Sequence, residues 1–387
     1  MSGNALGWSS SKVRTRTYLD WNATTPLRPE AAAAITSALS YCGNPSSVHH
    51  WGRAARQAME RARQSVGDLL AVRPEWVIFV SGGTEANHLA LLGTGRGRVL
   101  VSAVEHDSVL RAVPDAERIS VDRDGIVELD ELDRLLAADP RPALVSVMLA
   151  NNETGVIQPV KEIARIAREH GALFHCDAAQ AAGKIFFDAP AIAADLITLS
   201  AHKLGGPSGI GALVVTNDLE LTPLLRGGGQ ERGRRAGTQN LTGIVGFAAA
   251  ASAAAEQIAV YDRLRELRAS LEAGIAAIAP DAVVLGAAAQ RLPNTAAVAM
   301  PGVTAETQVI ALDLDGVMIS AGAACSSGKV GPSHVLQAMG VGPDLVGSTI
   351  RVSLGWTTSA ADIAHFLEAW TALYRRCHGQ APRARAA

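Results

Sequence analysis

Between residues 74 and 216 short apolar runs alternate with amphipathic segments, and this alternation constrains the fold more than any other feature of the sequence. Short apolar runs separated by helical segments are typical of a parallel sheet that is buried on both faces. The runs are Trp76–Val80, Val99–Ala103, Ala143–Leu149, Ala172–Cys176, Leu196–Leu199 and Ile210–Val215. The sequence therefore predicts an α/β fold with a mainly parallel, doubly wound sheet, which binds ligands where its strands end.

A second, smaller α/β domain is predicted after this region. A helix over Arg53–Ala71 should pack on the large sheet, and a long helical region follows at residues 241–279. Beyond it come expected strands at Thr295–Met300, Val317–Ser320 and Ile350–Leu354, and expected helices at Glu306–Leu312 and Ser359–Arg376. We place the large domain at residues 17–258 and the small C-terminal domain at 259–378. Residues 1–16 could pack on the small domain, and residues 379–387 should form a disordered tail.

Composition limits the classes of function. Lysine and arginine number 35 against 37 aspartates and glutamates, and the formal net charge of -2 predicts neither a nucleic-acid nor a membrane partner. Residues 1–16 lack the apolar core of a secretory signal, and residues 241–279 carry too many charges for a bilayer span. We therefore expect a globular, cytoplasmic protein. The cysteines show no C-x-x-C pair and no zinc-site spacing, so no metal site is expected.

Lys203 ends the motif Ser200-Ala-His-Lys203, which follows an apolar run and precedes a glycine-rich segment at 205–211. A lysine in a loop is most often a solvated surface residue. At the carboxyl end of a buried strand, however, a lysine stands where a carbonyl cofactor can form a Schiff base, and the glycines let the backbone pass close to a ligand. The setting favours the second interpretation.

Asp177 ends another apolar run, in His175-Cys-Asp-Ala-Ala-Gln180, about one crossover before Lys203. Both side chains should therefore reach the same edge of the sheet. Pyridoxal phosphate needs such a pair, because it forms an imine with a lysine and its pyridine nitrogen pairs with a carboxylate. Asp177 could equally be a helix N-cap before Ala178, and taken singly the two roles are about even. Cys176 points to the opposite side of the strand and is expected in the core.

The segment Val80-Ser-Gly-Gly-Thr-Glu-Ala-Asn87 predicts a strand end, a glycine turn and a helix start. Free N–H groups and the Thr84 hydroxyl would suit a phosphate dianion at the positive end of that helix. The segment differs from G-x-x-x-x-G-K-[ST] and from G-x-G-x-x-G, so it does not support a nucleotide-triphosphate or dinucleotide site.

Taken together, these motifs resemble those of the cysteine desulfurases, within the class V aminotransferase-like group of fold-type I pyridoxal-phosphate enzymes. The resemblance covers the chain from Tyr18 to about Leu373. It rests on residues 18–26, 43–46, 81–87, 105–106, 151–155, 177–180, 200–203, 227–238, 322–325 and 350–354.

The resemblance implies a role for each matching residue. Lys203 should form the Schiff base with the cofactor, and Asp177 should pair with its pyridinium nitrogen. Gln180 and Asn152 should hydrogen-bond the phenolic oxygen and its surroundings, and His106 should stack on the ring instead of being a satisfied loop histidine. The implied phosphate ligands are Gly83, Thr84, Ser200, His202 and, from the neighbouring subunit of a homodimer, Thr238. Arg351, with Asn152, should bind the substrate, by clamping its carboxylate.

Cys325 lies in Ala321-Gly-Ala-Ala-Cys-Ser-Ser-Gly-Lys329, where little side-chain bulk is available to bury a thiol. The resemblance identifies it as the nucleophile of the subgroup with a long cysteine-bearing loop. It implies removal of sulfur from L-cysteine, which leaves L-alanine and a persulfide on Cys325. The persulfide would pass to a sulfur-accepting protein such as an iron–sulfur scaffold. The C-terminal extension by which housekeeping members dock that scaffold has no match in residues 380–387.

Two alternatives remain open from the sequence. A selenocysteine lyase or another class V pyridoxal-phosphate enzyme would share Lys203 and Asp177 without needing Cys325. A non-catalytic scaffold with the same fold would not need Lys203, Asp177, His106 and Arg351 together. Alanine release from cysteine, with and without Cys325, distinguishes these possibilities.

Overall fold

The computed structural model describes residues 16–40, 42–216, 219–322 and 331–379. Its centre is a seven-stranded sheet in the order β2-β8-β7-β6-β5-β3-β4. The strands are β2 (Val77–Val80), β3 (Arg98–Ser102), β4 (Glu117–Ile119), β5 (Ala143–Ser146), β6 (Leu173–Asp177), β7 (Leu196–Ser200) and β8 (Gly211–Val215). Strands β4, β3, β5, β6 and β7 pair in parallel, whereas β8 is antiparallel to both β7 and β2. The predicted mainly parallel sheet is confirmed.

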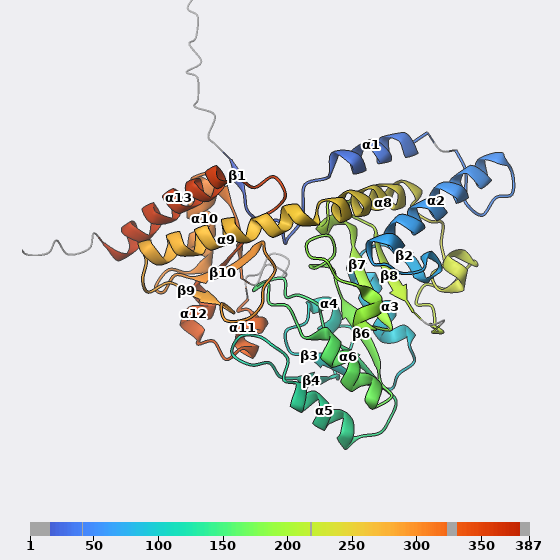
Figure 1. Cartoon of the computed structure of the whole chain (residues 1–387), viewed down its shortest axis with the longest axis horizontal. Helices are drawn as coiled ribbons and strands as arrows, with labels where there is room; N and C mark the ends of the chain where they lie inside the picture. Colours follow the sequence, from blue (N-terminus) through green and yellow to red (C-terminus); the bar gives the residue numbers. More distant parts are fainter. Residues whose placement is uncertain (1–15, 41, 217–218, 323–330, 380–387) are drawn as a thin grey trace, which may run out of the picture.

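Both faces of this sheet are buried, and the side chains alternate between them. On β8, Ala212 and Val214 join the core on one face, while Leu213 and Val215 join the core on the other. The first face packs against α2 (His50–Leu69), α6 (Val160–Glu169) and α8 (Leu241–Glu256), and the second packs against α3 (Gly83–Gly93) and α4 (Asp107–Leu110). Helix α1 (Pro29–Ala38) lies along α8 on the outside (Figure 1). The short helices α5 (Leu129–Ala138) and α7 (Ala189–Ile192) complete this part.

A second core lies around a four-stranded antiparallel sheet in the order β12-β13-β10-β9. The strands are β9 (Val283–Leu285), β10 (Thr295–Ala299), β12 (Ser320–Ala321) and β13 (Thr349–Ser353). The helices of this part are α9 (Ile258–Ile278), α10 (Ala305–Leu314), α11 (His334–Ala338), α12 (Pro343–Ser348) and α13 (Ala360–His378). Figure 1 shows this part beside the large sheet, joined to it by the consecutive helices α8 and α9.

Two expected strands are shorter or divided in the structure. Strand β5 ends at Ser146, although Val147 and Leu149 still donate backbone hydrogen bonds to β6 and the last residues of the expected run stay buried. The expected strand Val317–Ser320 is two strands, because β11 (Val317–Met318) pairs with β1 (Thr17–Tyr18), whereas β12 pairs with β13. Among the described residues no single helix is long and apolar enough to cross a membrane, and α8 with α9 passes that test only as a pair bent by 65°.

The segment that follows β1 crosses from the second core to the large sheet. Leu19 is buried in the second core, and Asp20 bridges to Ser353 beside it. A few residues later, the backbone N–H and hydroxyl of Thr25 both donate to the carbonyl of His202. Residues 17–25 therefore contact both parts of the molecule, and the domain limits 17–258 and 259–378 stay a prediction.

Candidate active site

The carboxyl ends of the central strands surround a pocket of about 260 Å³. Loops after β2, β3, β6 and β7 contribute to it, as expected for a parallel sheet. The lining residues are Asn22, Ala23, Gly83, Thr84, Asn87, His106, Ser108, Met148, Ala150, Asn152, Asp177, Ala179, Gln180, Ser200, His202, Lys203 and Arg351. The structure thus brings together every site residue named from the sequence except Thr238 and Cys325.

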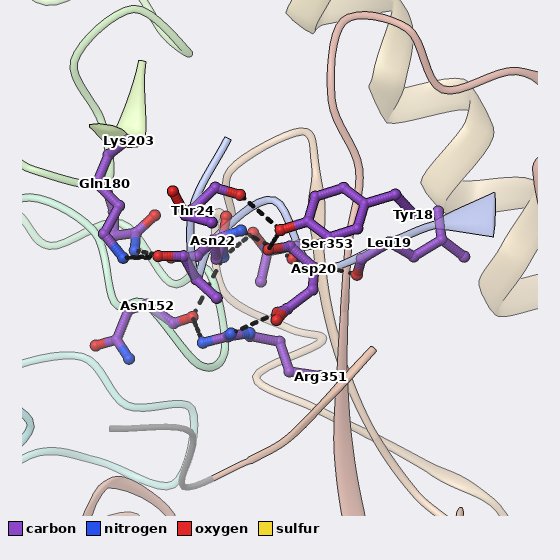
Figure 2. Close-up of polar contacts among 12 residues, drawn as sticks. Tyr18, Leu19, Asp20, Asn22, Thr24, Asn152, Gln180, Lys203, Arg351 and Ser353 are labelled. Atoms are coloured by element: carbon purple, nitrogen blue, oxygen red, sulfur yellow. Dashed lines mark hydrogen bonds and ion pairs between the residues drawn. The ribbon is translucent and has the colours of Figure 1, made fainter. Parts of the chain in front are cut away.

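Lys203 lies in a short 3-10 turn, Ala201–Lys203, directly after β7. Its Nζ donates to the backbone carbonyls of Asn22 at 2.5 Å and Ala23 at 2.8 Å. Figure 2 shows the Lys203 side chain directed toward the Asn22 segment. After Lys203 the chain turns sharply at Gly205, whose φ of +98° suits glycine, and a Cβ there would lie 2.4 Å from Cγ of Arg28. The amine is therefore held at the pocket by backbone oxygens of the N-terminal segment.

Asp177 ends β6 and has a partner for each carboxylate oxygen. Oδ1 accepts from the backbone N–H of Ala179 at 2.9 Å, and Oδ2 accepts from Nδ2 of Asn87 at 2.8 Å. The capping role and the pocket-facing role left open by the sequence are compatible, because the same carboxylate caps the following turn and lines the pocket. These two hydrogen bonds fix the orientation of the carboxylate at the edge of the pocket.

His106 caps the short helix α4, and its Nδ1 accepts from the backbone N–H of Ser108 at 3.1 Å. The Ser108 hydroxyl lies 2.8 Å from the same ring nitrogen and also accepts from Asn87. Burial lowers the pKa of His106, and nearby Asp177 opposes part of that change. The ring is therefore neutral at physiological pH, and its orientation is fixed by the Asn87 and Ser108 side chains.

The start of α3 forms an anion cradle at the pocket. The helix begins at Gly83 after extended Gly82 and has no side-chain cap, so its first N–H groups are not used by a capping side chain. A Cβ at Gly83 would lie 3.5 Å from Cβ of Ser200, so a side chain at position 83 would fill the space between the start of α3 and Ser200. The pKa of His202 is lowered to about 4, first by burial and then by Lys203 and Lys184. The cradle thus offers neutral donors and a helix N-terminus to a dianion.

Arg351, on β13, already has protein partners. Its NH2 nitrogen donates to Oδ1 of Asp20 at 2.8 Å, and NH1 donates to the Asn152 carbonyl at 3.2 Å (Figure 2). Arg351, expected to clamp a substrate carboxylate, is therefore paired within the protein even without a ligand. Among the described residues, however, its buried Nε has no hydrogen-bond partner. The guanidinium is therefore held in place with donor capacity left for a carboxylate.

Glu153 is a buried carboxyl group next to these residues. Its Oε2 accepts from the Ser333 hydroxyl at 2.5 Å, and burial raises its pKa to about 7, although Ser333 and Arg351 oppose the rise. A raised folded-state pKa means that the protonated form is favoured in the folded protein. Stability should therefore fall as the pH rises from about 4.5 through about 7.

Replacing Glu153 by Gln should remove this pH-dependent loss. We expect Glu153→Gln to be more stable than the natural protein by about 3 kcal/mol at pH 8 and equal to it near pH 4.5. Chemical denaturation at both pH values measures the difference, with the exposed Glu162→Gln as the matched control. A Gln variant that is less stable at pH 8 would show that the ionised carboxylate is a net stabilising group.

Two expected site residues are not placed at this pocket. Thr238 is exposed and lines a separate hollow of about 100 Å³ with Ser81 and Arg235. Cys325 lies outside the described residues. The chain enters that segment from β12, whose Ser320 is paired with Arg351 on the neighbouring strand.

The sequence reasoning missed Asn22, Asn87, Asp20 and Lys184. Asn22, Asn87 and Asp20 lie inside motifs that carried the resemblance, but their partners are distant in sequence and no local pattern gives them. Lys184 was missed because buried lysines are rare, although its position four residues after Gln180 favours contact in a helical turn.

The fold and this pocket define a class V aminotransferase-like enzyme. The aminotransferase class-V family model matches residues 17–366, and the chain belongs to this family. The cysteine desulfurase of Cereibacter sphaeroides is 44% identical over 368 residues, which cover 91% of this chain and 94% of that protein. The cysteine desulfurase IscS of Dictyoglomus turgidum is 38% identical over 371 residues, covering 92% and 94%. A NifS-like protein from Rickettsia africae has a structure that matches with a TM-score of 0.87 at 35% identity, covering 93% of this chain and 99% of that one. The family resemblance and the fold-type I architecture predicted from the sequence are confirmed.

Proposed function

We propose that this protein is a cysteine desulfurase that uses pyridoxal phosphate, converts L-cysteine to L-alanine and retains the sulfur on Cys325. The observation that carries the proposal is the presence of Lys203, Asp177 and Arg351 in one pocket. An amine, a hydrogen-bonded carboxylate and a carboxylate-binding arginine are the groups that amino-acid chemistry on this cofactor requires. Among the reactions of class V aminotransferase-like enzymes, the relatives named cysteine desulfurase favour sulfur removal.

The pocket residues fit the cofactor by their chemistry. The cradle of Gly83, Thr84, Ser200 and His202 suits its phosphate, and Asp177 suits its pyridine nitrogen. His106 offers a flat neutral ring, and Lys203 offers the amine. When bound, pyridoxal phosphate supplies an electron sink for the charge that develops at the substrate α-carbon.

Side chains of this protein orient the substrate and move its proton. Arg351, held by Asp20 and Asn152, orients the substrate through its carboxylate. The Lys203 amine then takes the α-proton, and the carbonyls of Asn22 and Ala23 hold its Nζ at the pocket beforehand. Asn87 and the Ala179 N–H hold the Asp177 carboxylate in place at the pocket.

The sulfur step belongs to Cys325. Its thiolate attacks the sulfur of the substrate, the substrate C–S bond breaks, and the electron pair of that bond stays with the carbon fragment. Protonation of this fragment gives L-alanine, while Cys325 carries the extra sulfur as a persulfide. A sulfur-accepting protein then takes that sulfur and restores the thiol.

A homodimer is part of the proposal. Thr238 is exposed and lies away from this chain's own pocket, as expected for a residue that serves the pocket of a second copy. Arg63 and Glu231, which form a buried ion pair at 2.7 Å, tie the segment before Thr238 to α2. This pair holds the segment against its own subunit.

The experiment is a product assay on the purified protein supplied with pyridoxal phosphate. With L-cysteine we expect equal amounts of alanine and protein-bound or released sulfur, and with D-cysteine neither, because Arg351 fixes the orientation of the α-carbon. L-Selenocysteine is the comparison substrate. Alanine from selenocysteine with none from cysteine would reject the proposal in favour of a selenocysteine lyase. No turnover of either substrate would favour a non-catalytic scaffold.

A further inference from the structure

Lys184 is a fully buried lysine behind the pocket, and the proposed chemistry does not use it. Its Nζ donates to Oε1 of Gln180 at 2.7 Å and to Oδ1 of Asn22 at 2.9 Å. Both partners are neutral amide oxygens. Burying a lysine against neutral acceptors is costly, so a structural reason for its presence is required.

The contact with Lys184 determines which way the Gln180 amide faces. A lysine nitrogen in this position donates to the amide oxygen, so Oε1 of Gln180 must be turned toward Lys184. The amide nitrogen Nε2 is thereby turned the other way, where one of its hydrogens goes to the Asn22 carbonyl at 3.0 Å. That carbonyl also accepts from Lys203 at 2.5 Å, so Nε2 and the Lys203 amine share one oxygen (Figure 2).

We propose that Lys184 is a positioning residue that makes Gln180 present a hydrogen-bond donor, and not an acceptor, to the pocket. The second hydrogen of Nε2 remains for a ligand atom. The inference rests on the proposed cofactor site, where Gln180 would meet the phenolic oxygen of pyridoxal phosphate. That oxygen carries negative charge and requires a donor.

The orientation does not depend on the charge of Lys184. Burial lowers its pKa well below the ordinary value, and Lys203 and Arg351 lower it further. Both the amine and the ammonium form have at least two hydrogens, so either form can donate to Gln180 and Asn22. Asn22 Oδ1 is itself held by Nδ2 of Asn294 at 3.2 Å, which keeps this second acceptor in place.

The test is a pH titration of the visible absorption band of the holoenzyme. A donor to the phenolic oxygen favours its unprotonated form, so losing the donor raises the midpoint of the titration. We expect Gln180→Ala to raise the midpoint by about one pH unit, the size of one hydrogen bond to a charged atom. Lys184→Met should raise it in the same direction, and the double variant should be no higher than Gln180→Ala alone.

The controls separate this inference from its alternatives. Lys161→Met removes an exposed lysine on α6 and should leave the midpoint unchanged. Additive shifts in the double variant would overturn the inference, because Lys184 would then act through its charge and not through Gln180. An unchanged midpoint in Lys184→Met with a lowered melting temperature would also overturn it and leave a purely structural role. Absence of any visible band in the natural protein would reject the proposed function itself.

A second variant covers the case in which Lys184→Met does not fold. Gln180→Glu keeps Lys184 and can present only oxygens to the pocket at neutral pH. It should raise the midpoint more than Gln180→Ala. A midpoint equal to that of the natural protein would show that the pocket needs no donor at this position.

Discussion

Lys203→Ala is expected to lose the visible absorption band of the bound cofactor and all alanine production, a loss of at least about 10³-fold. Among the described residues, Lys203 is the only lysine that lines the pocket. Lys184, the other lysine nearby, is directed to Gln180 and Asn22 and is completely buried. No other described lysine can therefore take over the bond to the cofactor or the proton transfer.

Absorption spectra of the purified variant, recorded with added pyridoxal phosphate after desalting, test this expectation. Lys161→Ala is the matched control and should keep both the band and the activity. A normal band in Lys203→Ala would show that the cofactor is attached elsewhere. A lost band with normal turnover would show that the cofactor takes no part in the reaction.

Cys325→Ser is expected to abolish alanine and persulfide formation while leaving the response of the spectrum to added cysteine intact. The serine hydroxyl has a far higher pKa than a thiol and is a poor nucleophile toward sulfur. Lys203, Asp177 and Arg351 are unchanged in this variant, so binding of L-cysteine and removal of its α-proton should continue. Only the sulfur acceptor is missing, and the loss should again be at least about 10³-fold.

The sulfur should be found on one cysteine. Mass spectrometry after brief exposure of the natural protein to L-cysteine is expected to place the extra sulfur on the peptide that contains Cys325. Cys176 is a built-in negative control, because burial and then Asp177 raise the pKa of its thiol well above the ordinary value. Cys42→Ser and Cys377→Ser change exposed thiols and should keep full activity. Alanine release by Cys325→Ser would identify a different acceptor or a lyase.

The fold class followed from the sequence because burial on both faces imposes a continuous apolar run on each strand. The helix expected at Arg53–Ala71 is observed as α2, and the buried Cys176 is confirmed. Strand direction was not predictable in the same way. An apolar run has no direction, so the antiparallel placement of β8 against β7 and β2 depends on connections that the pattern does not contain.

The site was predictable in part for the same physical reason. Asp177 and Ser200 are the last residues of their strands and Lys203 follows closely, and parallel strands bring such ends together. The partners of these residues were not predictable, since Arg351 pairs with Asp20, 331 residues away, and Lys203 with Asn22, 181 residues away. Resemblance supplied the role of Gln180, but only the contact with Lys184 explains which atom of its amide should face a ligand.

The path of residues 17–25 determines when the pocket can form during translation. Asn22 leaves the ribosome early, yet its N–H binds the Ser353 hydroxyl, 331 residues later. Its side chain also donates to Thr295, which is made 273 residues after it. During translation the Lys203 loop therefore emerges while residues 17–25 still lack Thr295 and Ser353, and closure of so long a loop must await their synthesis. The nascent protein cannot complete its pocket before Ser353 has been synthesised, which delays sulfur chemistry until the second core is present.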